Sequence, residues 1–469
     1  MNTKILITLF LISSVMLTSC KKFLDVNPKS SLSEEQLFDS EIGFQQALTG
    51  VYSQMATRSL YGDNLSMGFV SALAQNYAVS GTGAPFVQTR ALNYTSAEVM
   101  GYTSAIWNTS YSAIAGLNKV LENTLEKRNV LSDQNYAMIR GEALGLRAYL
   151  HFELLRMFGP EFTAGAAEKA IPYKTAVDEF AVVPSTTEEV IRLVLADLTE
   201  AATLLKERDP IVVNKVSRRS KMNYYAVKAL EARVRLYSGD KAGALLAAQV
   251  VTSSGKFPFV TSAAASAAAG SRDRLYLNEE VFMVRVRDIS TWADPGYFKF
   301  NGSANFKLTR STANFNTLYE TAAGGGTDFR YLYRIEQDQT SPFPSKFWQT
   351  YQFNTLDTNR LDQHVPLIRL SEMYYIMAEA ASVTSDGVGY LNTVRQNRAL
   401  APLATTITPA LLNTEITKEY QKEFYAEGQL FYYYKRKKIV RMQFMTADIP
   451  LSKYQLPVPD SEKEYNPNY

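Results

Sequence analysis

The sequence predicts a mostly α-helical protein, in which helix pairs form a scaffold and a large loop-rich region carries only a few short strands. Three observations predict this fold class. Apolar residues recur at helical spacing in several long blocks. A Gly-Asp turn joins two of these blocks directly. Between the blocks, long stretches rich in Gly, Asn, Ser, Thr and aromatic residues have little helical periodicity.

The clearest helical block covers Asn135–Phe158. Its apolar positions lie on one face of a helix, and Gly159-Pro160 ends it. These positions are Ile139, Ala143, Leu146, Leu150, Leu154 and Met157. A second helix is predicted from Ser185 to about Lys206, because Ser185 and Glu188 form a capping-box pattern.

Similar periodicity predicts three more helices. One covers Met222–Leu236 and ends at Gly239, one is opened by Pro366 and runs to about Ala381, and the last covers Asn413 to about Glu427.

The Gly239-Asp240 turn suggests how the helices pair. It joins the helix that carries Ala232 to one in which Ala244, Ala248 and Val251 share a side. Small side chains let two helix backbones approach closely, and the arrangement resembles the tetratricopeptide helix pair. We therefore expect a right-handed superhelical scaffold; ordinary helix hairpins are the alternative. The scaffold is expected mainly over residues 36–57, 105–255 and 366–440.

Two loop-rich stretches, mainly 58–104 and 256–365, interrupt the scaffold. The second contains a Ser/Ala run at Ser262–Gly270 and one short alternating strand at Val281–Val286. Long loops inside a helical protein usually carry function. We expect the recognition site there, within a single domain over residues 20–469.

Composition excludes several classes of function. The 49 Lys and Arg against 46 Asp and Glu give a net charge of +3, which argues against nucleic acid as the main partner. His151 and His364 are the only histidines and there is one cysteine, so a His- or Cys-rich zinc site is not expected. The sequence has no phosphate-cradling loop and no Gly-x-Ser-x-Gly elbow. We expect no catalytic residue, metal or cofactor.

The N-terminus reads as a secretory signal over residues 1–19. Lys4 precedes an apolar run from Ile5 to Leu17, which is too short to span a bilayer. The following Thr18-Ser19-Cys20 resembles the lipobox of bacterial lipoproteins. Cys20 has no partner for an intramolecular disulfide, so we expect cleavage before it and lipid attached to it. An ordinary signal peptide that ends in Cys is the alternative.

Taken in order, segments along the whole chain resemble the SusD/RagB family of Bacteroidetes outer-membrane nutrient-binding lipoproteins. They are Cys20–Pro28, Trp107–Leu121, Gly141–Gly159, Arg369–Ala380, Leu391–Arg398 and Leu456–Glu462. The resemblance implies a helical scaffold that packs against a SusC-like TonB-dependent transporter. It also implies a non-catalytic nutrient site in the loop-rich part, for an oligosaccharide or a peptide. The expected location is the outer membrane, lipid-anchored and facing the cell exterior.

Two other functions remain open from the residues alone. A secreted glycoside hydrolase could use a pair among the many carboxylates, whose separation a sequence does not reveal. A periplasm-facing helical-repeat scaffold could bind protein partners only.

Candidate ligand contacts come from the two loop-rich stretches. Sugar binding needs flat apolar faces for the C–H side of a pyranose and planar polar groups for its hydroxyls. The first stretch offers Tyr61, Asn64 and Tyr77; the second offers Trp292, Asp294, Tyr297 and Phe298. The alternative for each is packing in the core or holding a loop.

Other conspicuous residues are expected to be structural. Trp107 lies on an apolar helical face and is predicted to be core. Arg140, Arg147 and Arg156 are predicted to form ion pairs on a helix surface, and Lys435–Lys438 a solvated basic surface.

Overall fold

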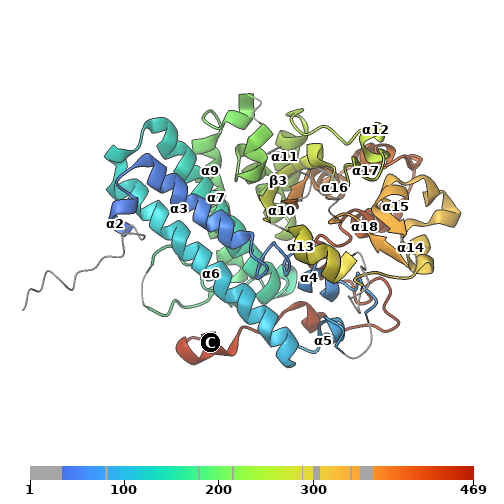
Figure 1. Ribbon diagram of the computed structural model, residues 1–469, viewed down its shortest axis with the longest axis horizontal. Coiled ribbons are helices and arrows are strands. Elements are labelled where there is room, and N and C mark those ends of the chain that lie inside the picture. The colour runs from blue at the N-terminus through green and yellow to red at the C-terminus, as the bar shows by residue number, and fades with distance from the viewer. Residues whose placement is uncertain are drawn as a thin grey trace, which may run out of the picture.

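The computed structural model describes residues 34–79, 83–177, 180–213, 216–287, 289–298, 307–337, 341–348 and 363–469. The predicted signal peptide and Cys20 lie outside these residues. Helices dominate the described part and the strands are short, as the sequence predicts (Figure 1). No helix of the described part is both long and apolar enough to cross a membrane.

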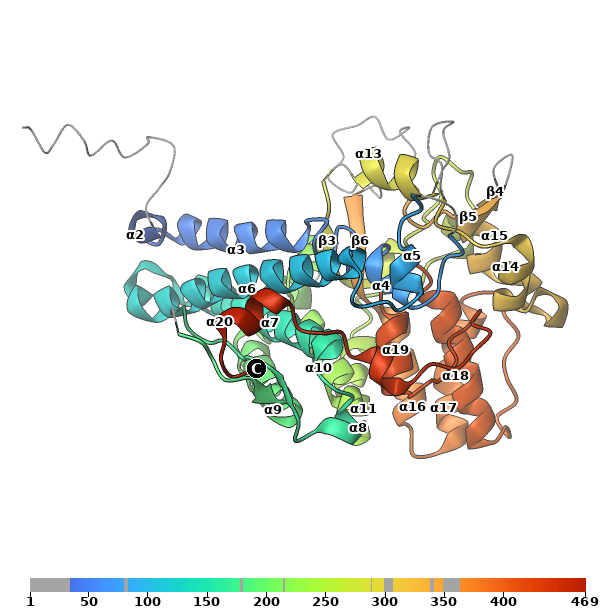
Figure 2. The ribbon, with the colours of Figure 1, turned by 90° about the horizontal axis from the view of Figure 1, so that it is seen from below.

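Three long helices form one end of the molecule. α6 (Ala97–Glu126) and α7 (Asp133–Phe158) pair side by side, and α3 (Glu41–Met55) lies along α6 (Figures 1 and 2). Ser96 and Ser132 cap α6 and α7 through their side-chain oxygens. The predicted helix over 135–158 is therefore confirmed, with its start fixed by the Ser132 cap.

α9 (Thr187–Leu205) packs on α7 as the next layer. The capping side chain is Thr186, one residue after the predicted Ser185, and it accepts from the Glu189 backbone N–H. The Glu189 carboxylate accepts from Arg192, so the predicted capping box is wrong although the helix is confirmed.

The predicted Gly-Asp turn is confirmed. α10 (Tyr224–Tyr237) and α11 (Lys241–Thr252) form a tight helix pair. Gly239 has φ +85°, a backbone conformation that costs a residue with a side chain about 1 kcal/mol or more. Asp240 then caps α11 by accepting from the Gly243 N–H at 2.9 Å.

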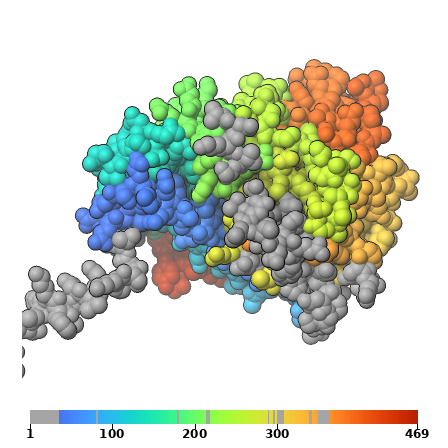
Figure 3. All heavy atoms as spheres, turned by 45° about the horizontal axis from the view of Figure 1, so that its top comes forward, coloured from blue at the N-terminus to red at the C-terminus, as the bar shows by residue number. Residues whose placement is uncertain are grey.

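The C-terminal part continues the helix pairs. α16 (Leu370–Ala380) packs on α11 and on α17 (Thr384–Gln396); α18 (Pro409–Glu423) and α19 (Leu430–Arg436) follow. Figure 3 shows this order on the surface: the blue and cyan N-terminal helices lie at one end and the yellow and orange segments at the other. One continuous apolar core extends from Phe38 to Leu456 and includes Trp107, as predicted.

Two predicted helix starts are wrong. Pro366 does not open a helix; it lies in strand β6 (His364–Arg369), which pairs antiparallel with β3 (Glu280–Arg285). All of β6 is buried, so its apolar run fits a covered strand as well as a helix. α18 begins at Pro409 instead of near Asn413, because Thr408 caps it and proline suits the first helical position.

The loop-rich stretches fold into short elements that lie together on one side (Figure 2). The first stretch contains α4 (Phe69–Leu73) and α5 (Val87–Arg90). The second contains α12 (Ser262–Ala265), α13 (Ile289–Ala293), η6 (Asp294–Phe298), α14 (Thr312–Tyr319), α15 (Phe329–Arg334), β4 (Ile335–Gln337) and β5 (Pro342–Pro344).

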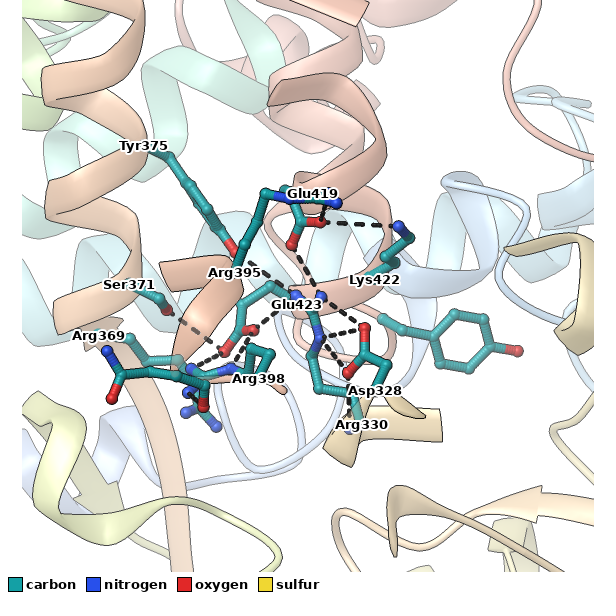
Figure 4. Close-up of polar contacts among 12 residues, drawn as sticks. Asp328, Arg330, Arg369, Ser371, Tyr375, Arg395, Arg398, Glu419, Lys422 and Glu423 are labelled. Carbon is teal, nitrogen blue, oxygen red and sulfur yellow. Dashed lines mark hydrogen bonds and ion pairs between the residues drawn. The ribbon is translucent and has the colours of Figure 1, made fainter. Parts of the chain in front are cut away.

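Buried charges join this side to the helical scaffold (Figure 4). Arg330 of α15 donates to Asp328, to Glu419 at 2.8 Å and to Glu423 at 3.0 Å; all four side chains are fully buried. Arg398 donates to Glu423 from the other direction and also binds Glu279. Burial raises the pKa of Glu419, but its cationic neighbours, Arg330 first, outweigh burial and hold that pKa at about 2.

Two predictions about basic residues are wrong in part. Arg140 pairs with the exposed Glu200, as predicted, but the ion pairs of Arg147 with Asp197 and of Arg156 with Glu153 are buried. Lys438 is exposed, as predicted, but Lys435 is buried. Its ammonium donates to the backbone carbonyls of Arg156 and Gly159, at the C-terminal end of α7. Those carbonyls have no partner within the helix, which gives the amine a structural role.

Candidate ligand-binding site

The two loop-rich stretches meet at a cluster formed by Arg58, Asp63, Trp292 and Tyr297. The Arg58 guanidinium lies over the Trp292 ring, 4.6 Å from its centre, and donates to the Tyr297 hydroxyl at 3.3 Å. Arg58 follows α3 directly, whereas Trp292 and Tyr297 lie in α13 and η6. Residues more than 230 positions apart in the sequence therefore form one surface.

Asp63 holds Arg58 and Tyr297 in place from the buried side of the cluster. Its carboxylate is buried and accepts from Arg58 at 2.8 Å and from the Tyr297 hydroxyl at 3.0 Å. Burial raises the pKa of Asp63, and the hydrogen bonds from Arg58 and Tyr297 offset part of this effect. Gly68 provides the space, since a Cβ there would lie 2.2 Å from Asp63 Oδ1.

Burial and the neighbouring Asp63 raise the pKa of Tyr297 far above neutrality, so its hydroxyl remains a donor at physiological pH.

Aromatic rings surround Tyr297. Its ring meets Trp292 edge to face at 5.9 Å between ring centres and packs against Phe86 at 6.0 Å. Phe86 in turn contacts Tyr102. Trp292, Tyr297 and Tyr102 are half-buried, and the Arg58 side chain is 58% exposed. The surface thus presents aromatic faces beside a forked hydrogen-bond donor, which suits planar and hydroxyl-bearing ligands.

The other predicted contacts lie behind this surface. Tyr61, Tyr77 and Phe298 are at most 1% exposed, and Asn64 is also buried. Tyr61 packs on Tyr149, the Tyr77 hydroxyl donates to the Met67 carbonyl, and Phe298 packs on Phe347. Asn64 donates to the Ser59 carbonyl. In this structure these four side chains hold the loops and are not available to a ligand. The side chain of Asp294 lies outside what the structure describes.

Sequence reasoning missed Arg58, Asp63, Phe86 and Tyr102. Arg58 and Asp63 stand beside predicted contacts in the same loop, so their proximity was a usable signal. Phe86 and Tyr102 gave no such signal, because their contact with Tyr297 depends on how separate segments pack.

A cavity of about 370 Å³ lies apart from the cluster, between α6, residues 172–177 and 180–182, and the C-terminal segment. Its lining includes Trp107, Tyr111 and Asn118, and none of the cluster residues. Asn118 donates to the carbonyls of Lys174 and Ala176 and so ties the covering loop to α6.

The paired helices, with their loop-rich side, define the chain as a helical-repeat protein of the tetratricopeptide-like class. Two family models agree. Residues 22–236 match a model described as starch-binding, associating with the outer membrane, and residues 297–468 match the SusD family model. The chain belongs to the SusD/RagB family, and the predicted family and fold class are confirmed.

Individual relatives are more distant. SusD-like protein P38 of Formosa agariphila is 29% identical over 280 residues, which are 58% of this chain and 49% of that protein. The chain thus spans about half the length of this curated relative. A SusD superfamily structure from Bacteroides thetaiotaomicron VPI-5482 is 22% identical with a TM-score of 0.69, covering 92% of this chain and 98% of that one. A SusD-like carbohydrate binding protein from Bacteroides vulgatus ATCC 8482 has 18% identity and a TM-score of 0.69, covering 92% and 97%.

Proposed function

We propose that this protein is a non-catalytic, surface-exposed lipoprotein of the outer membrane. Lipid on Cys20 anchors it, and it captures an oligosaccharide or a peptide and delivers it to a SusC-like TonB-dependent transporter. Membership of a family of carbohydrate-binding, outer-membrane-associated proteins supports this proposal. Of the two ligand classes, the family description favours the oligosaccharide.

The observation that carries the proposal is the contact between residues 58–63 and 292–297. On this proposal Trp292 offers a flat face to the C–H side of a sugar ring. Arg58 donates to its hydroxyls, the Tyr297 oxygen accepts from them, and buried Asp63 positions both groups. Tyr61, Asn64, Tyr77 and Phe298 support the loops from behind.

Binding of the purified protein to a glycan panel, followed by calorimetry, tests the site. Trp292→Ala should weaken binding of the selected glycan about 5- to 150-fold, since stacked rings and their burial contribute about 1–3 kcal/mol. Tyr465→Ala is the matched control, because Tyr465 is an aromatic residue 78% exposed outside the cluster. Equal affinity in wild type and Trp292→Ala would contradict the site.

Delivery and location need tests in cells. Deleting the gene should impair uptake of one oligosaccharide or peptide class without changing its hydrolysis. Cys20→Ala should release the protein from the membrane fraction, and protease added to intact cells should digest the wild type. Hydrolysis of a glycan by the purified protein, abolished by one carboxylate substitution, would instead establish the glycoside hydrolase. Protection from external protease would favour the periplasm-facing scaffold.

A further inference from the structure

Arg334, the last residue of α15, is a buried cation whose hydrogen-bonding capacity is unused. Its side chain is 3% exposed, and Nε, Nη1 and Nη2 have no hydrogen-bond partner among the described residues. One face of the guanidinium lies on the Tyr276 ring, 3.3 Å from the ring centre. This contact leaves the N–H groups at the guanidinium edge unsatisfied. A buried charge without hydrogen bonds is strongly unfavourable, so this position calls for an occupant.

The nearest carboxylate does not meet this need. Glu423 Oε1 lies 4.0 Å from Arg334 Nη1, beyond hydrogen-bond distance. The Glu423 carboxylate already accepts from Arg330 at 3.0 Å and from Arg398 at 2.9 Å. Arg334 is therefore a cation of that network with a long ion pair but no hydrogen bond.

A second unpartnered donor lies beside Arg334. The β4–β5 register pairs Ile335 with Pro344, and the Ser345 N–H donates to the Arg334 carbonyl at 2.7 Å. Residues opposite each other in such a pair direct their side chains to the same face. Ser345 Oγ is completely buried and, like the Arg334 nitrogens, has no partner in the described part of the chain.

Arg369 of β6 adds to the positive charge at this place. It is 1% exposed, and its Nη1 also lacks a partner among the residues that the structure describes. Arg334 and Arg369 act on the same neighbours: burial lowers the pKa of Lys346 to about 7 with help from both arginines, and both offset the effect of burial on the pKa of Asp273.

Several carboxylates surround these cations. Glu427, Glu423, Glu279 and Glu280 act on Arg369, and Asp273 faces both Arg334 and Arg369. Glu427 binds Lys346 at 2.5 Å and Arg369 at 2.9 Å, and Asp273 accepts from the backbone of residues 276 and 277. Neither carboxylate bonds to Arg334.

We propose that Arg334, Ser345 and Arg369 hold a small monovalent anion of halide size, chloride in the cell. Unpartnered N–H and O–H donors select an anion over a cation, and the burial of all three side chains selects a small one. The anion joins the base of the β4–β5 hairpin to β6, beneath the loop-rich side. It is distinct from the nutrient site and does not depend on the proposed function.

Crystals of the purified protein grown in bromide instead of chloride test the position directly. We expect an anomalous peak in contact with the Arg334 guanidinium and Ser345 Oγ. Water-like density there without an anomalous peak would overturn the proposal, since water would then satisfy the donors.

Thermal unfolding tests the binding in solution. Chloride replaces gluconate at constant ionic strength, and Tm should rise by about 1–2 °C per tenfold chloride above the dissociation constant. Ser345→Ala should shift this dependence to higher chloride and Arg334→Met should abolish it, whereas Arg441→Met, at an exposed ion pair, should preserve it. If Arg334→Met does not fold, Ser345→Ala and the bromide peak decide. A peak without chloride-dependent stability would mean an adventitious ion only and would overturn the proposal.

Discussion

The charge network around Glu423 offers the strongest test of how the loop-rich side is held to the scaffold (Figure 4). Glu423→Gln keeps the shape of the side chain and removes its charge. Glu423 is fully buried and binds Arg330 of α15 and Arg398 at the end of α17. Without this charge, two buried guanidinium groups share fewer carboxylates, although Asp328, Glu419 and Glu279 remain.

The expected loss of stability follows from the burial of the Glu423 ion pairs. Removing one partner of a buried ion pair typically costs about 3–5 kcal/mol. An unfolding entropy of about 2.1 cal/mol/K per residue gives about 1 kcal/mol/K for a chain of 469 residues, so Tm should fall by about 3–5 °C. Calorimetry at neutral pH measures this fall. Glu464→Gln, at an exposed carboxylate, is the matched control and should leave Tm within about 1 °C.

Two results would refute this reasoning. If Glu423→Gln has the same Tm as the wild type, the network does not hold α15 to the scaffold. If the substitution weakens glycan binding without lowering Tm, Glu423 belongs to the site and not to the support. The fall in protein stability at acid pH gives an independent check on the network. The folded-state pKa of Glu419 is about 2, below its unfolded value, so its stabilisation is present above about pH 4.3 and is lost as pH falls toward 2.

Two further predictions concern the site floor and the α7 terminus. Gly68→Ala places a Cβ 2.2 Å from Asp63 Oδ1, so the Asp63 carboxylate must turn away from Arg58 and Tyr297. We expect denaturant unfolding to show a loss of about 1–3 kcal/mol in stability. We also expect calorimetry to show weaker glycan binding. Gly50→Ala is the control, because Gly50 lies on the exposed face of α3 with open space around its Cβ, and it should stabilise by about 0.5–1 kcal/mol. Unchanged glycan affinity in Gly68→Ala would count against a positioning role for Asp63. Burial lowers the pKa of Lys435 to about 7, below its unfolded value near 10.4, so the unfolded chain binds more protons between these values and stability should rise with pH from about 7 to 10. Lys435→Met should flatten that rise in thermal melts taken across this range, and an equal slope in wild type and variant would disprove the assignment to Lys435.

Helices with long apolar faces could be predicted from the sequence, because their period is local. The blocks that became α7, α9, α10 and α11 were recognised within a few residues, and the Gly239-Asp240 turn fixed how α10 and α11 pair. Pro366 misled because a fully covered strand and a buried helix share the same apolar composition. The prediction of a solvated Lys435 was wrong because its partners are backbone carbonyls at the end of α7, which no sequence pattern reveals.

The candidate site shows the same limit at the level of side chains. The loops that contain it could be predicted, since both lack periodicity and are rich in aromatic residues. Which aromatic residues reach the surface could not be predicted, because Tyr61 and Trp292 lie in loops of similar composition and differ only in how they pack. The structure buries Tyr61 against Tyr149 and leaves Trp292 half-buried under Arg58.

The position of Arg58 bears on how a ligand would enter the proposed site. Arg58 covers one face of Trp292, yet an exposed cation–π contact contributes only about 0.5–1 kcal/mol. Moving the guanidinium off the ring therefore costs less than a sugar ring gains by stacking there, about 1–3 kcal/mol. Because Asp63 accepts from Nε and Nη2 of Arg58, the displaced guanidinium stays beside the ring and its Nη1 can donate to the incoming hydroxyls. The buried carboxylate thus matters to the proposed site even though a ligand need never touch it.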